Sequence, residues 1–521
     1  MSGPAAFGRL IGAGWMLARN DALLPRELDP LYSPAVRSFA ALLPRELDAL
    51  YPPAVRSAAG LLHLLSGRQA REGRPGERLA RSLERLGPVA IKLGQLLSTR
   101  ADIIGAEFAE DLSRLKDRLA PFPTDLARRE VELSLGRPIG DLFESFGEAV
   151  AGASLAQAHE ARLIDGRRVA VKVLRPGIAR RVAADAEVLR LAARLVEGWS
   201  IPARRLEPRA FAETVIRATE LELDLRLEAA GADELGEVMG QDGYMAVPKV
   251  VWDGVGKRVL TLEWAQGEPL SSAAALEQEG LDRRGLADNL IRAFLAQALD
   301  HGVFHADLHE GNLFAAAPAQ LMAVDFGIIG RLGADERRYL AEILWGFLER
   351  DYERVARVHF EAGYVPAKHS VAAFAQALRA VGEPLFGRAA SQVSMSRVLT
   401  QLFEITAIYE MRLRPELVLL QKTMMTVEGV ARRIYPDHDI WAAADPVVRR
   451  WILRELSPAA RIRRFAGEAL DALQAIRKLA QAPAPAVVVP VAPPNPGGAL
   501  LWFAVGAVVS GLAFVAATLL R

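Results

Sequence analysis

The stretch His305-Ala306-Asp307-Leu308-His309-Glu310-Gly311-Asn312, followed by Asp325-Phe326-Gly327, decides the fold class of this 521-residue chain. Its H-x-D-x-x-x-x-N spacing is that of the catalytic loop in phosphoryl-transfer enzymes, where the aspartate accepts or orients a hydroxyl proton. The asparagine gives an amide oxygen to Mg²⁺, which also takes one or two carboxylates and phosphate oxygens. The Asp-Phe-Gly tripeptide follows a short apolar run and supplies such a carboxylate. We therefore predict Asp307 as the base, and Asn312 and Asp325 as the magnesium ligands.

The same loop allows a second interpretation, in which His305, Asp307 and His309 bind a zinc or iron ion. Three potential ligands within five residues are compatible with such a site. The downstream Asp-Phe-Gly weakens this alternative, because it supplies the further carboxylate that a magnesium-nucleotide site requires.

A lysine upstream extends the pattern. Lys172 lies in the apolar run 168–174 (RVAVKVL), which predicts a buried strand. A buried ammonium needs an anionic partner, and in phosphoryl transfer a strand lysine holds the α/β-phosphates of ATP and is positioned by a helix glutamate. The acidic run 222–228 (ELDLRLE) offers three acids, of which we choose Glu228, with Glu222 as the alternative. Without the other motifs, Lys172 would also be explained as a residue at the edge of a strand whose ammonium group reaches into water.

The remaining pattern predicts an α+β fold with a small mixed sheet and a larger helical lobe. Strands are expected at 168–174, 249–252 and 258–263, with helices from about 180 to 236 between the first two. Glu263 and Trp264, at the end of the third strand, are assigned to nucleotide binding. The predicted segments are 1–75, a variable helical region; 76–137, a helical extension; 138–270, the small lobe; 271–480, the helical lobe; 481–498, a proline-rich linker; and 499–520, a membrane helix.

Composition limits the classes of function. The chain has 64 Lys and Arg against 63 Asp and Glu, so it has no global attraction for nucleic acid. The absence of cysteine excludes disulfides, thiolate-bound zinc and iron–sulfur clusters. Near the N-terminus, residues 22–40 and 41–59 match at 16 of 19 positions, a tandem duplication to which we assign no function.

A membrane anchor is predicted at the C-terminus. Residues 499–520 carry no charge and, at 1.5 Å per residue, are long enough to cross a bilayer. The segment 449–478 has eight Arg and Lys against three acids, which favours a cytoplasmic main body. No secretory signal is found at the start. Gly506 and Ser510 have the small-xxx-small spacing that would allow a homodimer.

Three further motifs resemble those of the UbiB/ADCK family of atypical kinase-like proteins, over residues 76 to at least 330. Lys92-Leu93-Gly94-Gln95 is similar to the family's KxGQ signature, and Glu222-Leu223-Asp224 to its ExD motif. Residues 151–157 (AGASLAQ) resemble the alanine-rich loop that replaces a glycine-rich phosphate loop, and no G-x-G-x-x-G occurs in the sequence. The resemblance implies that Ala151, Ala153 and Ser154 contact nucleotide.

The resemblance also implies an atypical protein-kinase-like bilobal fold whose helical extension covers the active site. There Lys92 would pair with Glu222 and Asp224 and, with Gln95, occlude a peptide substrate. The implied function is a Mg²⁺- and ATP-dependent kinase or ATPase that supports ubiquinone biosynthesis at the cytoplasmic side of the bacterial inner membrane. Its partners would be polyprenylated quinone intermediates and other biosynthetic proteins. Gly231 departs from the family, which usually has asparagine there.

Other functions remain open at this point. Some relatives have been labelled polyprenylphenol hydroxylases, but the sequence has no flavin or Rossmann-type fingerprint. A non-catalytic scaffold could bind nucleotide and organise other enzymes. A small-molecule kinase of the aminoglycoside or choline type would share the catalytic motifs, although it has no reason to carry KxGQ. The sequence does not name the phosphoryl acceptor.

Overall fold

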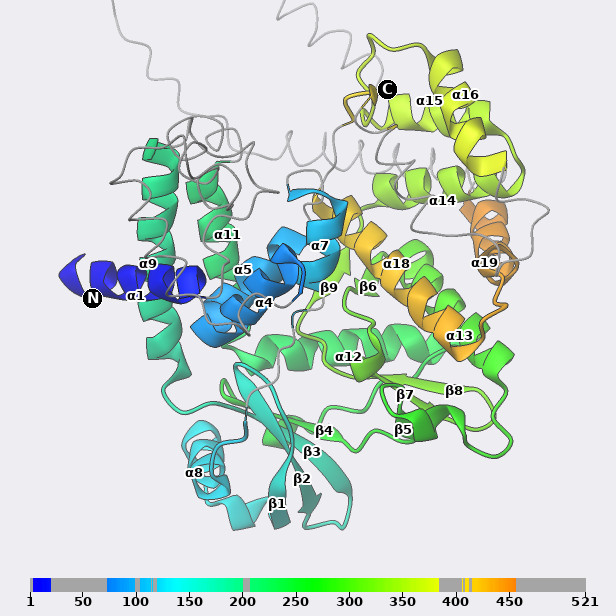
Figure 1. Ribbon diagram of the computed structural model, residues 1–521. Coiled ribbons are helices and arrows are strands. Elements are labelled where there is room, and N and C mark those ends of the chain that lie inside the picture. The colour runs from blue at the N-terminus through cyan, green and yellow to red at the C-terminus, as the bar shows by residue number, and fades with distance from the viewer. Residues whose placement is uncertain are drawn as a thin grey trace, which may run out of the picture. The chain divides into compact units, whose positions relative to one another are not determined.

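A four-stranded antiparallel sheet forms the small lobe of the computed structural model (Figure 1). Its strands are β1 (Phe143–Gly152), β2 (Ala156–Leu163), β3 (Arg168–Leu174) and β4 (Val259–Glu263), in that order. Side chains alternate along a strand, so Val169, Val171 and Val173 share one fully buried face. Helix α8 (Thr124–Leu135) covers that face with Ala127 and Val131. Lys172 therefore lies on the opposite face of the sheet.

The structure describes residues 3–19, 73–98, 104–113, 115, 120–199, 207–383, 405, 408–411 and 415–455. All of them belong to the unit Met1–Leu456. The duplication at 22–59, the linker at 481–498 and the span predicted at 499–520 lie outside the described residues. None of the helices in the described ranges is long and apolar enough to cross a membrane.

Three helices connect β3 to β4, as the sequence predicts: α9 (Ile178–Trp199), α11 (Pro208–Leu221) and α12 (Leu225–Asp242). Helices α9 and α11 pack side by side (Figure 1). Asp224 caps α12, since its side chain accepts a hydrogen bond from the backbone N–H of Arg226. Leu225 and Ala229 then pack against Leu260 of β4, which brings the first turns of α12 beneath the sheet.

The predicted strand at 249–252 is wrong. Val250 forms only an isolated bridge with Leu262, and the chain then turns into the 3₁₀ helix Trp252–Gly254. The turn is stabilised by the Thr261 hydroxyl, which donates to the Gly254 carbonyl at 2.9 Å. Conversely, the hairpin β1–β2 was not predicted as strands, because 143–163 is rich in Ala, Gly and charged residues that mask a β pattern.

The helical lobe is built around α13 (Arg283–Ala296), which packs between α18 (Pro415–Ile434) and α19 (Ile440–Glu455) (Figure 1). A turn of π-helix, Gln297–His301, leads from α13 to the loop that begins at His305. The described part of the lobe also contains α14 (Ala334–Leu348), α15 (Tyr352–Glu361) and α16 (Val371–Gly382). Short strands lie at the lobe boundary: β5 (Glu268–Pro269), β6 (Val303–His305), β7 (Leu313–Ala316), β8 (Gln320–Ala323) and β9 (Ile329–Arg331).

The basic flank predicted before the membrane span belongs in part to this lobe. Arg450 and Arg454, both on α19, pair with the buried carboxylate of Asp300 at 2.5 and 2.8 Å. Arg449 pairs with Asp445 at 3.2 Å, one turn away on the same helix. Arg450 and Arg454 therefore fasten α19 to the π-helical turn that contains Asp300.

The extension consists of α4 (Pro75–Leu86), α5 (Pro88–Ser98) and α7 (Ala106–Ser113), which share a small core around Leu112. A Cβ at Gly94 would overlap the side chains of Leu83 and Leu115. The glycine of the KxGQ motif is thus a packing residue that lets α5 approach its neighbours closely. A further helix, α1 (Gly3–Arg19), packs on α9, where Arg9 pairs with Asp185 at 3.0 Å.

Candidate nucleotide site

Lys172 and Glu228 form a buried ion pair between β3 and α12. The Lys172 Nζ donates to both carboxylate oxygens of Glu228, at 2.7 and 2.9 Å. The Glu228 side chain is only 8% exposed. Of the two glutamates considered from the sequence, Glu228 is therefore the partner of Lys172. Its place on α12, directly beneath the sheet, was not readable from the acidic run alone.

Asp325 contacts the same lysine from the helical lobe, with its Oδ1 3.1 Å from the Lys172 Nζ. Its backbone is left-handed, with a φ of 65°. Lys172 holds the pKa of Asp325 down to about 2 against the opposing effect of burial. Burial raises the pKa of Glu228 to about 7, although Lys172 opposes that shift. Burial disfavours the charge on Lys172, yet Asp325 and Glu228 together raise its pKa above the ordinary value.

His305 joins the catalytic loop to the Asp-Phe-Gly segment. Its Nε2 donates to the Val324 carbonyl (3.1 Å), its Nδ1 accepts from the Asp307 N–H (3.1 Å), and its ring lies 5.2 Å from that of Phe326. Burial lowers the pKa of His305, in keeping with a neutral ring. Both nitrogens are thus engaged, so His305 has no lone pair left for a metal.

The zinc or iron interpretation is therefore wrong. His309 also has a local use, because its Nδ1 accepts from the Gly311 N–H at 3.0 Å. Within the described ranges, no group of three or more His, Asp or Glu side chains could hold a metal ion.

Asn312 faces the catalytic loop through its amide nitrogen, which donates to the Asp307 carbonyl at 3.0 Å. Its own backbone carbonyl accepts from the Val324 N–H at 2.9 Å, which ties the loop to the strand before Asp325. With the nitrogen engaged, the amide oxygen of Asn312 is left as a possible ligand. An amide oxygen and an ionised carboxylate are oxygen donors of the kind that Mg²⁺ takes, so these residues fit the cation.

The alanine-rich segment forms the tip of the hairpin between β1 and β2. Arg175 fixes this tip, because its Nε donates to the Ala153 carbonyl and its Nη2 to the Ala120 carbonyl, each at 3.0 Å. Ala151 is exposed, whereas Ser154 is buried. The contacts of Ala151, Ala153 and Ser154 with a nucleotide stay predictions.

The extension reaches the site through Lys92, which is buried and forms an ion pair with Glu222 at the end of α11. The predicted pairing of Lys92 with Asp224 is wrong. The Asp224 carboxylate instead pairs with Arg226 at 2.6 Å and caps α12. The backbone carbonyl of Gln95 accepts a hydrogen bond from the Ser98 hydroxyl at 2.6 Å.

The two residues predicted at the end of β4 lie at the connection between the lobes. The Glu263 carboxylate pairs with Arg167 at 3.1 Å. The Trp264 ring lies 4.0 Å from the Arg168 guanidinium. Both side chains are thus engaged by arginines of β3 and its turn, and their role in nucleotide binding stays a prediction.

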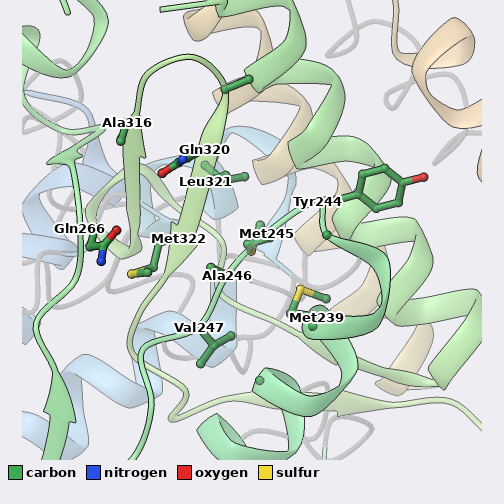
Figure 2. A pocket seen from close by; sticks show the side chains of 14 residues that line it. Met239, Tyr244, Met245, Ala246, Val247, Gln266, Ala316, Gln320, Leu321 and Met322 are labelled. Carbon is green, nitrogen blue, oxygen red and sulfur yellow. The ribbon is translucent and has the colours of Figure 1, made fainter.

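A cavity of about 380 Å³ lies near the same connection but apart from the predicted site. Figure 2 shows it between the end of α12, Gln266 and the β7–β8 hairpin, with Met239, Met245 and Met322 among its labelled lining. None of the residues predicted for the site lines it.

Sequence reasoning missed the contribution of α18. The Thr423 hydroxyl donates to the Ala306 carbonyl at 3.1 Å, and Arg433 forms an ion pair with Glu310. Both contacts brace the catalytic loop from a helix more than 100 residues away in sequence. No local pattern indicates such a contact, since it depends on how α18 packs against α13.

A lysine–glutamate pair beneath a hairpin, facing a His-x-Asp loop tied to an Asp-Phe-Gly segment, defines a kinase-like site. Residues 114–359 match the ABC1 atypical kinase-like domain, and residues 378–439 match the UbiB helical domain. The chain is 40% identical over 393 residues to a probable protein kinase UbiB of Marinobacter nauticus, covering 74% of this chain and 72% of that one. A probable protein kinase UbiB of Pseudomonas entomophila is 40% identical over 390 residues, with coverage of 74% and 73%.

This chain belongs to the ABC1/UbiB family of atypical kinase-like proteins, as its motifs suggested. A solved structure, the complex of Rv3197 with erythromycin from Mycobacterium tuberculosis, is similar with a TM-score of 0.50 and 22% identity. The match covers 75% of this chain and 97% of that one, and it shows that the two share a fold.

Proposed function

We propose that this chain is a Mg²⁺- and ATP-dependent kinase or ATPase that supports ubiquinone biosynthesis. The observation that carries the proposal is the meeting of Lys172 with Glu228 and Asp325, one from each side of the lobe boundary. In phosphoryl transfer such a lysine holds the phosphates and such a carboxylate holds the metal.

The chain's own residues would divide the work as follows. Lys172, held by Glu228, binds the α/β-phosphates. Asn312 and Asp325 hold Mg²⁺, which when bound neutralises charge on the phosphate oxygens. Asp307 accepts or orients the proton of the acceptor hydroxyl. Its position is fixed because its backbone N–H donates to His305 and its backbone carbonyl accepts from the Asn312 amide.

The extension favours an acceptor other than a protein side chain. Lys92 is buried in its ion pair with Glu222, so α5 is fastened at the edge of the site. A polyprenylated quinone intermediate, or water, fits this arrangement better than a peptide that needs an open groove. The span predicted at 499–520 would place the protein at the cytoplasmic side of the inner membrane, where such lipids and the other biosynthetic enzymes lie.

Nucleotide binding and cell function together test the proposal. The full chain in detergent should gain thermal stability with Mg²⁺·ATP, by about 2.7 kcal/mol at 100 times the dissociation constant. Asp325→Asn should abolish this gain and, in cells that depend on the protein, ubiquinone production. A cell that makes normal ubiquinone with Asp325→Asn or Asp307→Asn would favour the scaffold alternative and overturn catalysis.

A further inference from the structure

Helix α18 supports the catalytic loop at both ends. Thr423 is buried and donates its hydroxyl hydrogen to the Ala306 carbonyl, directly before Asp307. Arg433, three turns further along α18, pairs with Glu310 at the other end of the loop. The side chain of the residue before Thr423 interacts electrostatically with the proposed base, although it comes from the UbiB helical domain.

That side chain is Lys422, and its charge is unmatched. It is half-buried, and its ammonium interacts electrostatically with the Asp307 carboxylate and with the Lys92 ammonium. Lys92 already pairs with Glu222. Across the described part of the chain, by contrast, Lys422 has no ion-pair or hydrogen-bond partner for its Nζ. Burial lowers the pKa of Lys422, and Asp307 opposes that shift.

An ammonium taken partly out of water is costly unless an anion compensates it. Asp307 interacts with Lys422 electrostatically but does not come within ion-pair distance, so an anionic ligand placed beside both residues would compensate the charge of Lys422. If Asp307 faces the acceptor oxygen, and Asn312 and Asp325 hold the metal, the group between them is the terminal phosphate of the nucleotide. Lys172, held by Glu228, is assigned to the α/β-phosphates, which leaves the γ-phosphate without a lysine of its own.

We propose that Lys422 binds the γ-phosphoryl group of ATP and stabilises its charge during transfer, an inference that rests on the proposed function. The bond that breaks joins the γ-phosphorus to the β,γ-bridging oxygen, whose electron pair leaves with ADP. The bond that forms joins the acceptor oxygen to the same phosphorus, and the acceptor proton passes to Asp307. Lys422 keeps its protons and offers a fixed positive charge to the equatorial oxygens, as phosphate-binding lysines do.

The experiment compares two nucleotides that differ in the γ-phosphate. Dissociation constants of Mg²⁺·ADP and of Mg²⁺ with the β,γ-imido analogue of ATP are measured by calorimetry for the full chain and for Lys422→Met. We expect Lys422→Met to leave the affinity for ADP within about twofold and to weaken the analogue about tenfold, the usual loss for one charged hydrogen bond. ATP turnover should fall further, and Lys422→Arg should restore part of both.

The matched control is Met425→Ala, an exposed position on the same helix, which should change neither affinity. Equal weakening of both nucleotides would show that Lys422 only supports the fold, and unchanged affinity for both would show that it binds no γ-phosphate. A normal analogue affinity with a raised KM for an acidic acceptor would place the lysine on the acceptor instead, and would also overturn the inference. If the unaltered chain binds neither nucleotide, the proposed function fails with it, whereas binding without Lys422 dependence spares that function.

Discussion

Glu228 is the single residue on which the candidate site most depends. It neutralises Lys172 in a place where an unpaired ammonium is disfavoured, and removing one member of a buried pair costs about 3–5 kcal/mol. Asp325 remains as a second partner for Lys172 and should absorb part of that cost. Glu228→Gln is thus expected to lower the free energy of unfolding by about 1–3 kcal/mol and nucleotide affinity at least tenfold.

Thermal unfolding of Glu228→Gln and of the unaltered chain measures the loss of stability, and calorimetry measures the loss of nucleotide affinity. The matched control is Glu234→Gln on the same helix, which breaks an exposed pair with Arg331 and should cost less than about 1 kcal/mol. If both variants lose the same stability and neither loses affinity, the Lys172–Glu228 pair is merely structural.

Single residues with short-range roles were predictable from the sequence. The loop from His305 to Asn312 followed from a motif whose spacing encodes its geometry. For Lys172 the sequence favoured Glu228 but left Glu222 as the alternative, and the position of α12 decides between them. The capping role of Asp224 and the place of Lys422 were not predictable. The first depends on where α12 begins, and the second on tertiary packing of a helix with no catalytic motif.

Among the secondary-structure elements, the pairing of β6 with β9 positions the catalytic loop. Gly330 lies directly opposite Phe304, and a Cβ there would overlap the buried Phe304 ring. An aromatic ring on a strand cannot swing away as the end of a long side chain can. Gly330→Ala should therefore destabilise the protein by about 1–3 kcal/mol, the usual cost of overpacking.

Chemical denaturation measures this loss, and Phe304→Leu added to Gly330→Ala should recover part of it. Gly429→Ala serves as the control, since Gly429 lies on α18 with no atom within 4 Å of an added Cβ. It should be neutral or stabilise by up to about 1 kcal/mol through helix propensity. Equal effects of the two alanines would contradict the packing argument.

Element prediction succeeded where one pattern dominated. β3 has the bounds expected from its apolar run, and the helices between β3 and β4 begin at Ile178 and end at Asp242, slightly beyond the predicted range of about 180 to 236. Gly231, the departure from the family, lies on α12 where a Cβ would overlap Ile329 after the Asp-Phe-Gly segment. No periodicity signals that contact, just as none distinguished the polar hairpin β1–β2 from a loop.

At the scale of the whole molecule, the order of small lobe and helical lobe was predictable because each has its own periodicity. The relation of the extension to the site came only from the family resemblance, and the structure refined it to one ion pair, Lys92 with Glu222. Helix α8 shows the limit of sequence segmentation: it falls within 76–137 yet packs on the sheet through Ala127 and Val131.

The stability of the molecule should also depend on pH through histidines buried in both lobes. His359 is half-buried and is the simplest case, since its Nδ1 donates to the Val355 carbonyl at 2.8 Å and its ring packs against those of Tyr364 and Phe374. Burial lowers its pKa, so the folded protein keeps this ring neutral where the unfolded chain is protonated. The unfolded state then binds more protons, and stability falls as pH falls below the unfolded value of about 6.5.

Glu228 has the opposite sign, because its raised pKa of about 7 makes the folded state the better proton acceptor as pH falls. When a His359 variant is compared with the unaltered chain, the contributions of Glu228 and of every other titrating group to the pH dependence cancel. His359→Gln should lose stability at pH 7.5 through altered packing, but the gap between it and the unaltered chain should narrow by about 1 kcal/mol at pH 5.5. Melting temperatures across this range report the gap, and a constant difference from pH 7.5 to 5.5 would show that His359 gains its proton equally in both states.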